Sequence, residues 1–139
     1  MQKKKVKAFS ANPNDIIITA DTIVAINGEI LGKPQNHQEA QEMLGKLSGS
    51  QHEVYTGVSI NYKGKITSFY DRTEVFCRVL KLEEINYYIE NYQPFDKAGS
   101  YGVQDWFGLT VVERLNGSYT NVMGLPTEKL YQYLLKLVG

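Results

Sequence analysis

The chain has 139 residues, enough for one domain with a sizeable core and short for a two-domain enzyme. Fifteen Lys and Arg balance fifteen Asp and Glu, so the composition predicts no general attraction to nucleic acid or to an anionic membrane. The apolar runs are too short to span a bilayer, and the start lacks the apolar core of a signal peptide. One cysteine and two histidines argue against an internal disulfide or a structural zinc site, and a cytoplasmic protein is expected.

The first third of the chain predicts a strand, a hairpin and a helix. An apolar, β-branched run at residues 16–20 follows a turn-forming Asn-Pro-Asn segment and indicates a buried strand, continued to Ile26. Asn27-Gly28 is a strong signal for a tight hairpin. Asn36 and Glu39 have the spacing of a capping box, and apolar residues then recur at helical spacing.

The rest of the chain continues to alternate strands and helices. Strands are predicted at residues 54–60, 65–79 and 109–115, a helix at 82–92, and a terminal helix opened by Pro126. Because the hairpins bring antiparallel pairs into a chain that also alternates strands with helices, we expect an α/β fold with a mixed sheet, not a purely parallel one.

Asp21 is the first candidate functional residue. It ends the apolar run, so we expect it at the carboxyl end of a buried strand, where open α/β sheets place their ligand sites. Lys33 supplies a positive charge a little later in the chain. The pair predicts a site for an anionic ligand that also binds a metal. A solvated carboxylate at a strand end is the alternative interpretation.

Two loops contain more polar and ionisable side chains than a turn requires. Residues 94–104 combine an acid, a base, an amide and a phenol with glycines that allow a ligand to approach the backbone. Residues 117–126 are polar and run into a helix N-terminus, which attracts anions. Each loop could equally be a structural turn.

Five segments stand in a recognisable order and spacing: ADTIV (20–24), LGKP (31–34), LSGSQHEVYTGV (47–58), DKAGSYGVQ (96–104) and GSYTNVMGLP (117–126). Together they resemble the Maf (septum-formation) family of nucleoside triphosphate pyrophosphatases, from about Lys4 to the C-terminus. The resemblance implies a single domain over residues 1–139 with a Maf/inosine-triphosphatase-like α/β fold. It also implies a mixed sheet with flanking helices around a central cleft, and a homodimer.

Members of this family hydrolyse a nucleoside triphosphate between its α- and β-phosphates, with a divalent cation such as Mg²⁺ or Mn²⁺. Water attacking a phosphorus crowded by anionic oxygens needs a metal, cations over the phosphates and a base. By resemblance, Asp21 is the catalytic carboxylate and metal ligand, and Lys33 neutralises phosphate charge. A second family lysine falls within Lys3–Lys5, and the local pattern favours Lys5 as a substrate-binding residue.

The resemblance also implies which base is chosen. Thr22 and Gln104 match positions linked to base choice and resemble the branch acting on dTTP and UTP, with modified pyrimidine nucleotides as further substrates. A Gln amide can pair with both the carbonyl and the N–H of a uracil or thymine ring. His52 also matches a family position, but we expect a structural, hydrogen-bonding role for it. Asp96 and Lys97 are expected to form an ion pair that shapes their loop, and substrate contact by Lys97 is the alternative interpretation.

The chain departs from the family in two places. It lacks the Ser-x-Ser-Pro-Arg-Arg segment with which members begin, so it looks like either a truncated member or a degenerate relative. Asp105-Trp106 stands where the family normally has glycine, and Trp106 is expected to narrow the base pocket or to pack at a subunit contact. A non-catalytic nucleotide-binding or interaction protein is therefore a second hypothesis. A phosphatase with Asp21 as nucleophile is a weak third, because its Asp-x-Asp-x-Thr pattern is missing.

Overall fold

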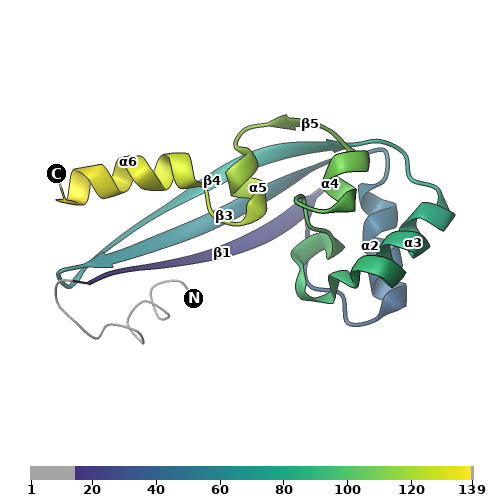
Figure 1. The fold of residues 1–139 in the computed structure, drawn as a ribbon, viewed down its shortest axis with the longest axis horizontal. Helices are drawn as coiled ribbons and strands as arrows, with labels where there is room; N and C mark the ends of the chain where they lie inside the picture. Colours follow the sequence, from purple (N-terminus) through teal and green to yellow (C-terminus); the bar gives the residue numbers. More distant parts are fainter. Residues whose placement is uncertain (1–14, 139) are drawn as a thin grey trace.

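The computed structural model describes residues 15–138 of the chain (Figure 1). A five-stranded sheet has the strand order β2-β1-β3-β4-β5. Its strands are β1 (Ile16–Ile26), β2 (Glu29–Leu31), β3 (Gln51–Tyr62), β4 (Lys65–Cys77) and β5 (Val112–Asn116). The helices are α2 (His37–Leu47), α3 (Leu82–Tyr92), α4 (Trp106–Thr110), α5 (Tyr119–Met123) and α6 (Thr127–Val138), with 3-10 turns η1 (Pro94–Asp96) and η2 (Ala98–Ser100). Helices α2, α3 and α4 gather at one end of the long strands, and α6 lies toward the other end (Figure 1).

Two tight hairpins set the register of the sheet. Asn27 and Gly28 have φ values of 50° and 80°, and Lys63 and Gly64 have φ values of 53° and 77°. Two consecutive residues with positive φ match the right-handed twist of the strands that they join. The first turn pairs β1 with β2, and the second pairs β3 with β4 over their full length.

The predicted α/β fold with flanking helices is confirmed, and the sheet has a simpler pairing than expected. Every described strand pair is antiparallel, whereas a mixed sheet was predicted. The reason lies between β2 and β3: helix α2 returns the chain so that β3 enters beside β1 in the opposite direction. Helix α2 therefore connects two strands, β2 and β3, that run in the same direction on either side of β1, so this crossover leaves no parallel pair of adjacent strands.

Helix α2 begins, and helix α3 ends, where the sequence predicted. The side chain of Asn36 accepts a hydrogen bond from the backbone N–H of Glu39 at 2.9 Å, which caps α2. Glu39 in turn accepts from the backbone N–H of Gln35 at 2.9 Å, one residue before the capping residue. Gln93 adopts the left-handed conformation after α3, and Pro94 prevents the helix from continuing.

Two expectations about the strands are wrong. Leu109 belongs to α4, and the strand predicted at residues 109–115 begins at Val112. The chain coils there because Asp105 caps α4 and because a side chain at Gly108 would lie 1.7 Å from the carbonyl oxygen of Val103. Asp21 lies in the middle of β1 instead of at the end of a buried strand, since β1 is only partly buried before it and pairs with β3 on both sides of it.

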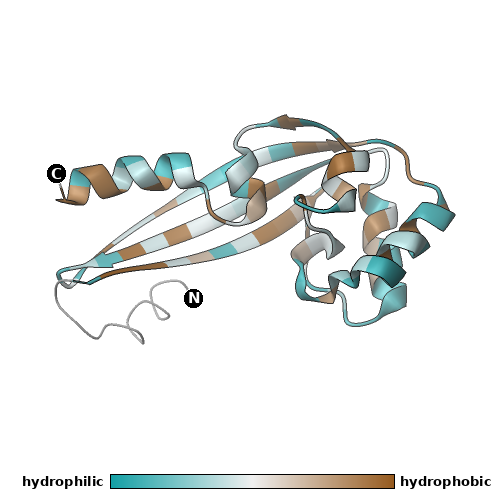
Figure 2. Cartoon of the chain, in the orientation of Figure 1, coloured by the Kyte–Doolittle hydropathy of each residue, from teal (hydrophilic) through white to brown (hydrophobic). Residues whose placement is uncertain are grey.

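The hydrophobic core has two clusters. The larger one joins the helical end of the molecule to the ends of β1, β3 and β4, with Leu44 and Phe107 fully buried. The smaller one lies under α6 and contains Val58, Ile60, Phe69 and Leu130. Figure 2 shows apolar residues both at the helical end and along α6. The larger cluster supports the loops that carry the candidate site.

Three threonines separate the two clusters, and we call Thr22, Thr56 and Thr73 the threonine band. Thr56 and Thr73 are fully buried. On β3, Thr56 lies between Val54 of the larger cluster and Val58 of the smaller one. The hydroxyl oxygens of Thr22 and Thr56 are 2.9 Å apart, within hydrogen-bonding distance. The band is therefore a line of hydroxyl groups between the two apolar clusters.

Candidate active site

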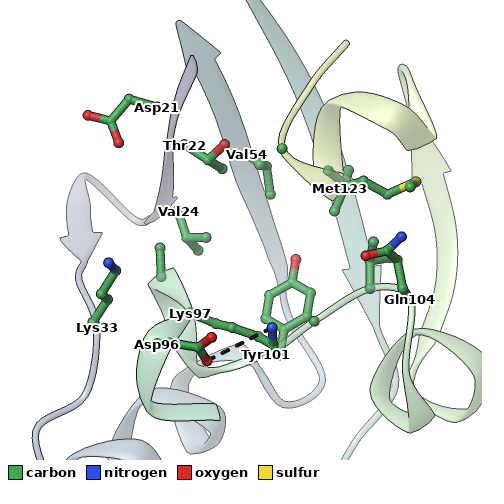
Figure 3. A pocket seen from close by; sticks show the side chains of 15 residues that line it. Asp21, Thr22, Val24, Lys33, Val54, Asp96, Lys97, Tyr101, Gln104 and Met123 are labelled. Atoms are coloured by element: carbon green, nitrogen blue, oxygen red, sulfur yellow. Dashed lines mark ion pairs between the residues drawn. The ribbon is translucent and has the colours of Figure 1, made fainter. Parts of the chain in front are cut away.

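A cavity of about 270 Å³ opens where β1, the segment after β2 and the two polar loops meet (Figure 3). Asp21 and Lys33 lie on one side of it in Figure 3, and Gln104 and Met123 lie on the other. Its floor includes apolar side chains of β1 and β3, namely Val24 and Val54. The cavity thus has a charged side and a side lined by amide and thioether groups.

The structure brings four of the predicted site residues together. Asp21, Thr22, Lys33 and Gln104 all line this cavity. Asp21, Lys33 and Gln104 are solvent-exposed, so their polar groups are accessible to a ligand. Lys5 lies outside the described residues. The functional role given to each of these residues stays a prediction.

Asp21 and Thr22 reach the same cavity although neighbouring residues of a strand point to opposite faces. Strand β2 pairs with β1 from Val24 to Ile26 and stops short of both residues. The cavity opens at this margin of the sheet, where a ligand can contact a side chain from either face. The Asp-Thr pair can therefore present a carboxylate and a hydroxyl to one molecule.

The loop at residues 94–104 is tied to the segment that carries Lys33. The backbone N–H of Gly99 donates to the carbonyl oxygen of Gly32 at 3.1 Å. Gly99 has a φ of 73°, and an added Cβ would lie 3.0 Å from the methyl groups of Val24. The expected pair of Asp96 and Lys97 is present, with 3.9 Å between Oδ1 and Nζ (Figure 3).

A buried histidine, His52, contacts Tyr101, which lines the cavity. The Nε2 atom of His52 lies 2.6 Å from the hydroxyl oxygen of Tyr101, and the two rings meet edge to face at 5.3 Å. Burial lowers the pKa of His52 to about 4, so the ring is neutral near pH 7. Burial also raises the pKa of the Tyr101 hydroxyl. The predicted structural, hydrogen-bonding role of His52 is confirmed.

The loop at residues 117–126 contains a short helix that sequence reasoning missed. Ser118 caps α5 by accepting from the backbone N–H of Asn121 at 3.1 Å, and Gly124 ends it with a φ of 115°. The side-chain amide of Asn121 donates to the carbonyl oxygen of Val54 at 3.1 Å and to Thr73 Oγ1 at 2.9 Å. The sequence signal that could have predicted this short helix is Ser118 at a capping position, three residues before Asn121, with Gly124 after it.

Asn121 thereby attaches the loop to the threonine band. Its backbone carbonyl accepts from the hydroxyl of Thr56 at 3.1 Å, and Thr56 in turn contacts Thr22. Residues 122–124, which follow directly, line the cavity. One buried amide therefore fixes both the loop and the hydroxyl network that ends at Thr22.

Trp106 does not narrow the described cavity, and its expected place at a subunit contact stays a prediction. Its ring centroid lies 5.4 Å from that of Tyr87 and 5.9 Å from that of Tyr88, both on α3. It is absent from the described residues that line the cavity. Trp106 thus packs inside the domain, behind the loop that bears Gln104.

Comparison with known proteins identifies the family. Residues 1–137 match the family model described as Maf-like protein. The chain belongs to the Maf-like family. The resemblance proposed from the five sequence segments is therefore confirmed over almost the whole Maf-like chain.

Several curated relatives are similar to this Maf-like chain, and each is named dTTP/UTP pyrophosphatase. The protein of Cytophaga hutchinsonii is 49% identical over 138 residues, covering 99% of this chain and 63% of the relative. The Phocaeicola vulgatus protein is 52% identical over 126 residues, covering 91% and 65%. The Flavobacterium psychrophilum protein is 48% identical over 137 residues, covering 97% and 70%. The chain spans about two thirds of the length of these relatives.

Among the described residues, no helix is both long and apolar enough to cross a membrane. The same part of the chain holds no group of three or more His, Cys, Asp or Glu side chains suited to a metal ion.

Proposed function

We propose that this chain carries the nucleotide site of a pyrophosphatase that converts dTTP and UTP to the monophosphate and pyrophosphate. The observation that carries the proposal is the convergence of Asp21, Thr22, Lys33 and Gln104 on one cavity in a Maf-like protein. The relatives named dTTP/UTP pyrophosphatase, about half identical to this chain, support the same substrates.

The charged side of the cavity suits the triphosphate. Asp21 is exposed and lines the cavity, and the role assigned to it in this proposal is to orient a water molecule and to accept its proton as the water attacks the α-phosphorus. Lys33 adds a positive charge that offsets the charge on the phosphate oxygens. The bond between the α- and β-phosphates breaks, and pyrophosphate leaves.

A divalent cation fits this donor set. Mg²⁺ is commonly held by one or two carboxylates together with substrate phosphates and water, and an exposed Asp21 offers such a carboxylate. When bound, the cation supplies charge neutralisation at the reacting phosphate. Asp21 is the protein residue that we propose as its ligand.

The opposite side of the cavity suits a pyrimidine base. Gln104 offers an amide donor and an acceptor, which match the adjacent N–H and carbonyl of uracil and thymine. Thr22 also lines the cavity, and its hydroxyl oxygen lies 2.9 Å from that of Thr56. The cavity volume of about 270 Å³ is slightly below the usual range for ligand pockets, roughly 300–1,000 Å³.

The test of this function is pyrophosphate release from dTTP and UTP, with Mg²⁺ or Mn²⁺, in wild-type protein and in Asp21→Asn. Loss of the proposed base and metal ligand is expected to lower the rate by at least about 10²-fold. Lys33→Ala is expected to raise KM and to lower the rate less severely, because its charge only stabilises phosphate oxygens.

Asp15→Asn is the matched control, since Asp15 is an exposed carboxylate just before β1 and outside the described cavity lining. It is expected to keep wild-type activity. Activity of Asp21→Asn equal to that of Asp15→Asn would contradict the role given to Asp21. Binding of dTTP without any release of pyrophosphate by the wild-type chain would favour the non-catalytic alternative.

A further inference from the structure

The residue after Gln104 has two partners that lie outside the cavity. The carboxylate of Asp105 accepts through Oδ1 from the backbone N–H of Phe107 at 3.0 Å, which caps α4. Through Oδ2 it accepts from the hydroxyl of Tyr88 at 2.9 Å. Asp105 therefore connects the end of the loop to helix α3.

The same Tyr88 hydroxyl also binds the backbone on the N-terminal side of Gln104. It accepts from the backbone N–H of Gly102 at 3.0 Å while it donates to Asp105. The backbone N–H of Asp105 lies 3.4 Å from the carbonyl oxygen of Gly102, so the segment between them is a tight turn. One hydroxyl thus binds both flanks of the two-residue segment Val103-Gln104.

Tyr88 is rigidly placed. Its side chain is 1% exposed, and its ring stacks on Tyr92 at 5.2 Å and on Trp106 at 5.9 Å. Burial raises the pKa of its hydroxyl, which keeps the proton that it donates to Asp105. Gln104 itself is exposed, so the position of its amide depends on the backbone that carries it.

We propose that the Tyr88–Asp105 hydrogen bond is a positioning device for base selection, which rests on the proposed function of Gln104. It fixes the backbone at residues 102–105 so that the Gln104 amide meets the base edge in one orientation. Tyr88 and Asp105 are positioning residues, because neither belongs to the described lining of the cavity. Asp21 and Lys33 come from β1 and the segment after β2, outside the turn that this bond holds.

The test compares Tyr88→Phe, which removes one oxygen atom, with Tyr87→Phe, which removes the hydroxyl of the half-exposed neighbour. The specificity constant kcat/KM is measured for dTTP, UTP, CTP and GTP. In Tyr88→Phe the preference for dTTP and UTP is expected to fall about 5- to 20-fold, because Gln104 loses its fixed orientation. The fall should come mainly from a higher KM for dTTP and UTP, and Tyr87→Phe should keep the wild-type preference.

A second variant breaks the same hydrogen bond from its other partner, so the test does not depend on the folding of Tyr88→Phe alone. Asp105→Ser keeps an oxygen that can cap α4 but is too short to reach Tyr88, and thermal unfolding of each variant checks the fold. It is expected to lose the same preference as Tyr88→Phe. In a Gln104→Leu background, Tyr88→Phe is expected to cause no further loss, because both changes act on one contact.

The outcomes separate this inference from the proposed function. A folded Tyr88→Phe variant with unchanged preference, an equal fall for all four nucleotides, or a further loss in the Gln104→Leu background would each overturn the positioning role. Dissociation constants for the same nucleotides give a readout that does not need turnover. Wild-type protein that binds dTTP and UTP selectively without releasing pyrophosphate contradicts the proposed function alone, and Tyr88→Phe must still weaken that selectivity.

Discussion

The imidazole of His52 is 1% exposed and lies 2.6 Å from the hydroxyl oxygen of Tyr101. A charged ring in this setting would lose its hydration without gaining an anionic partner, which is why burial lowers its pKa to about 4. In the unfolded chain the same ring has an ordinary pKa of 6.5. This single residue therefore links the stability of the fold to pH.

The pH window follows from these two pKa values. Between pH 6.5 and about 4 the unfolded chain binds a proton that the folded chain does not, so the free energy of unfolding falls as the pH falls. The total loss is on the order of 3 kcal/mol, at about 1.4 kcal/mol for each pKa unit. Urea unfolding at a series of pH values measures it. His52→Gln is expected to flatten this slope, and an unchanged slope would contradict the assignment.

At the scale of elements, helix α5 is held on the sheet by the buried amide of Asn121. Asn121→Ala removes the side-chain donor to the carbonyl oxygen of Val54 and one of two donors to Thr73 Oγ1, which still accepts from the backbone N–H of Ser118. An unpaired buried group costs about 1–3 kcal/mol, so we expect a loss of about 1–3 kcal/mol in the free energy of unfolding.

Asn116→Ala is the matched control, because Asn116 is exposed on β5 and its amide donates to Glu74 at the surface. Its cost is expected to stay within about 0.5 kcal/mol. Chemical denaturation of both variants makes the comparison. Equal costs for the two would show that α5 does not depend on the buried amide.

Sequence patterns predicted those elements whose signals are local. The Asn27-Gly28 hairpin, the cap of α2 at Asn36 and the end of α3 before Pro94 each depend on a few adjacent residues. Helix α4 was missed because Leu109 belongs to a β-branched run that resembles a strand, while close contact at Gly108 decides the backbone. Tertiary contact overrode propensity there.

The candidate site shows the same division between features with a local sequence signal and features that depend on tertiary contacts. Family resemblance placed Asp21, Thr22, Lys33 and Gln104, and the structure gathers them in one cavity. The supporting residues were not found, because a hydrogen bond such as that between Tyr88 and Asp105 joins positions far apart in the chain and leaves no periodic pattern. Such partners become visible only when the fold brings them together.

At the scale of the whole molecule, large apolar side chains remain exposed on several of the described elements. Ile16, Ile18 and Ile23 are exposed on β1, and Tyr131, Leu135 and Val138 are exposed on α6. Apolar surface of this kind favours association. The predicted homodimer stays a prediction, and we expect light scattering to give twice the 15.8 kDa chain mass. A monodisperse species at the chain mass would contradict it.

The threonine band also affects which substitutions the chain tolerates. Free energies of substitution add when two residues share no partners and lie more than about 7–10 Å apart, and they couple within one hydrogen-bond network. No described residue belongs to both the cluster under α6 and the cluster at the helical end, so we expect substitutions in different clusters to be closer to additive. Thr56, Thr73 and Asn121 share partners, so a change at one alters the cost of a change at another. Sequence drift is therefore free to proceed separately in each apolar cluster, and it is most restricted along the polar line beneath the proposed base pocket.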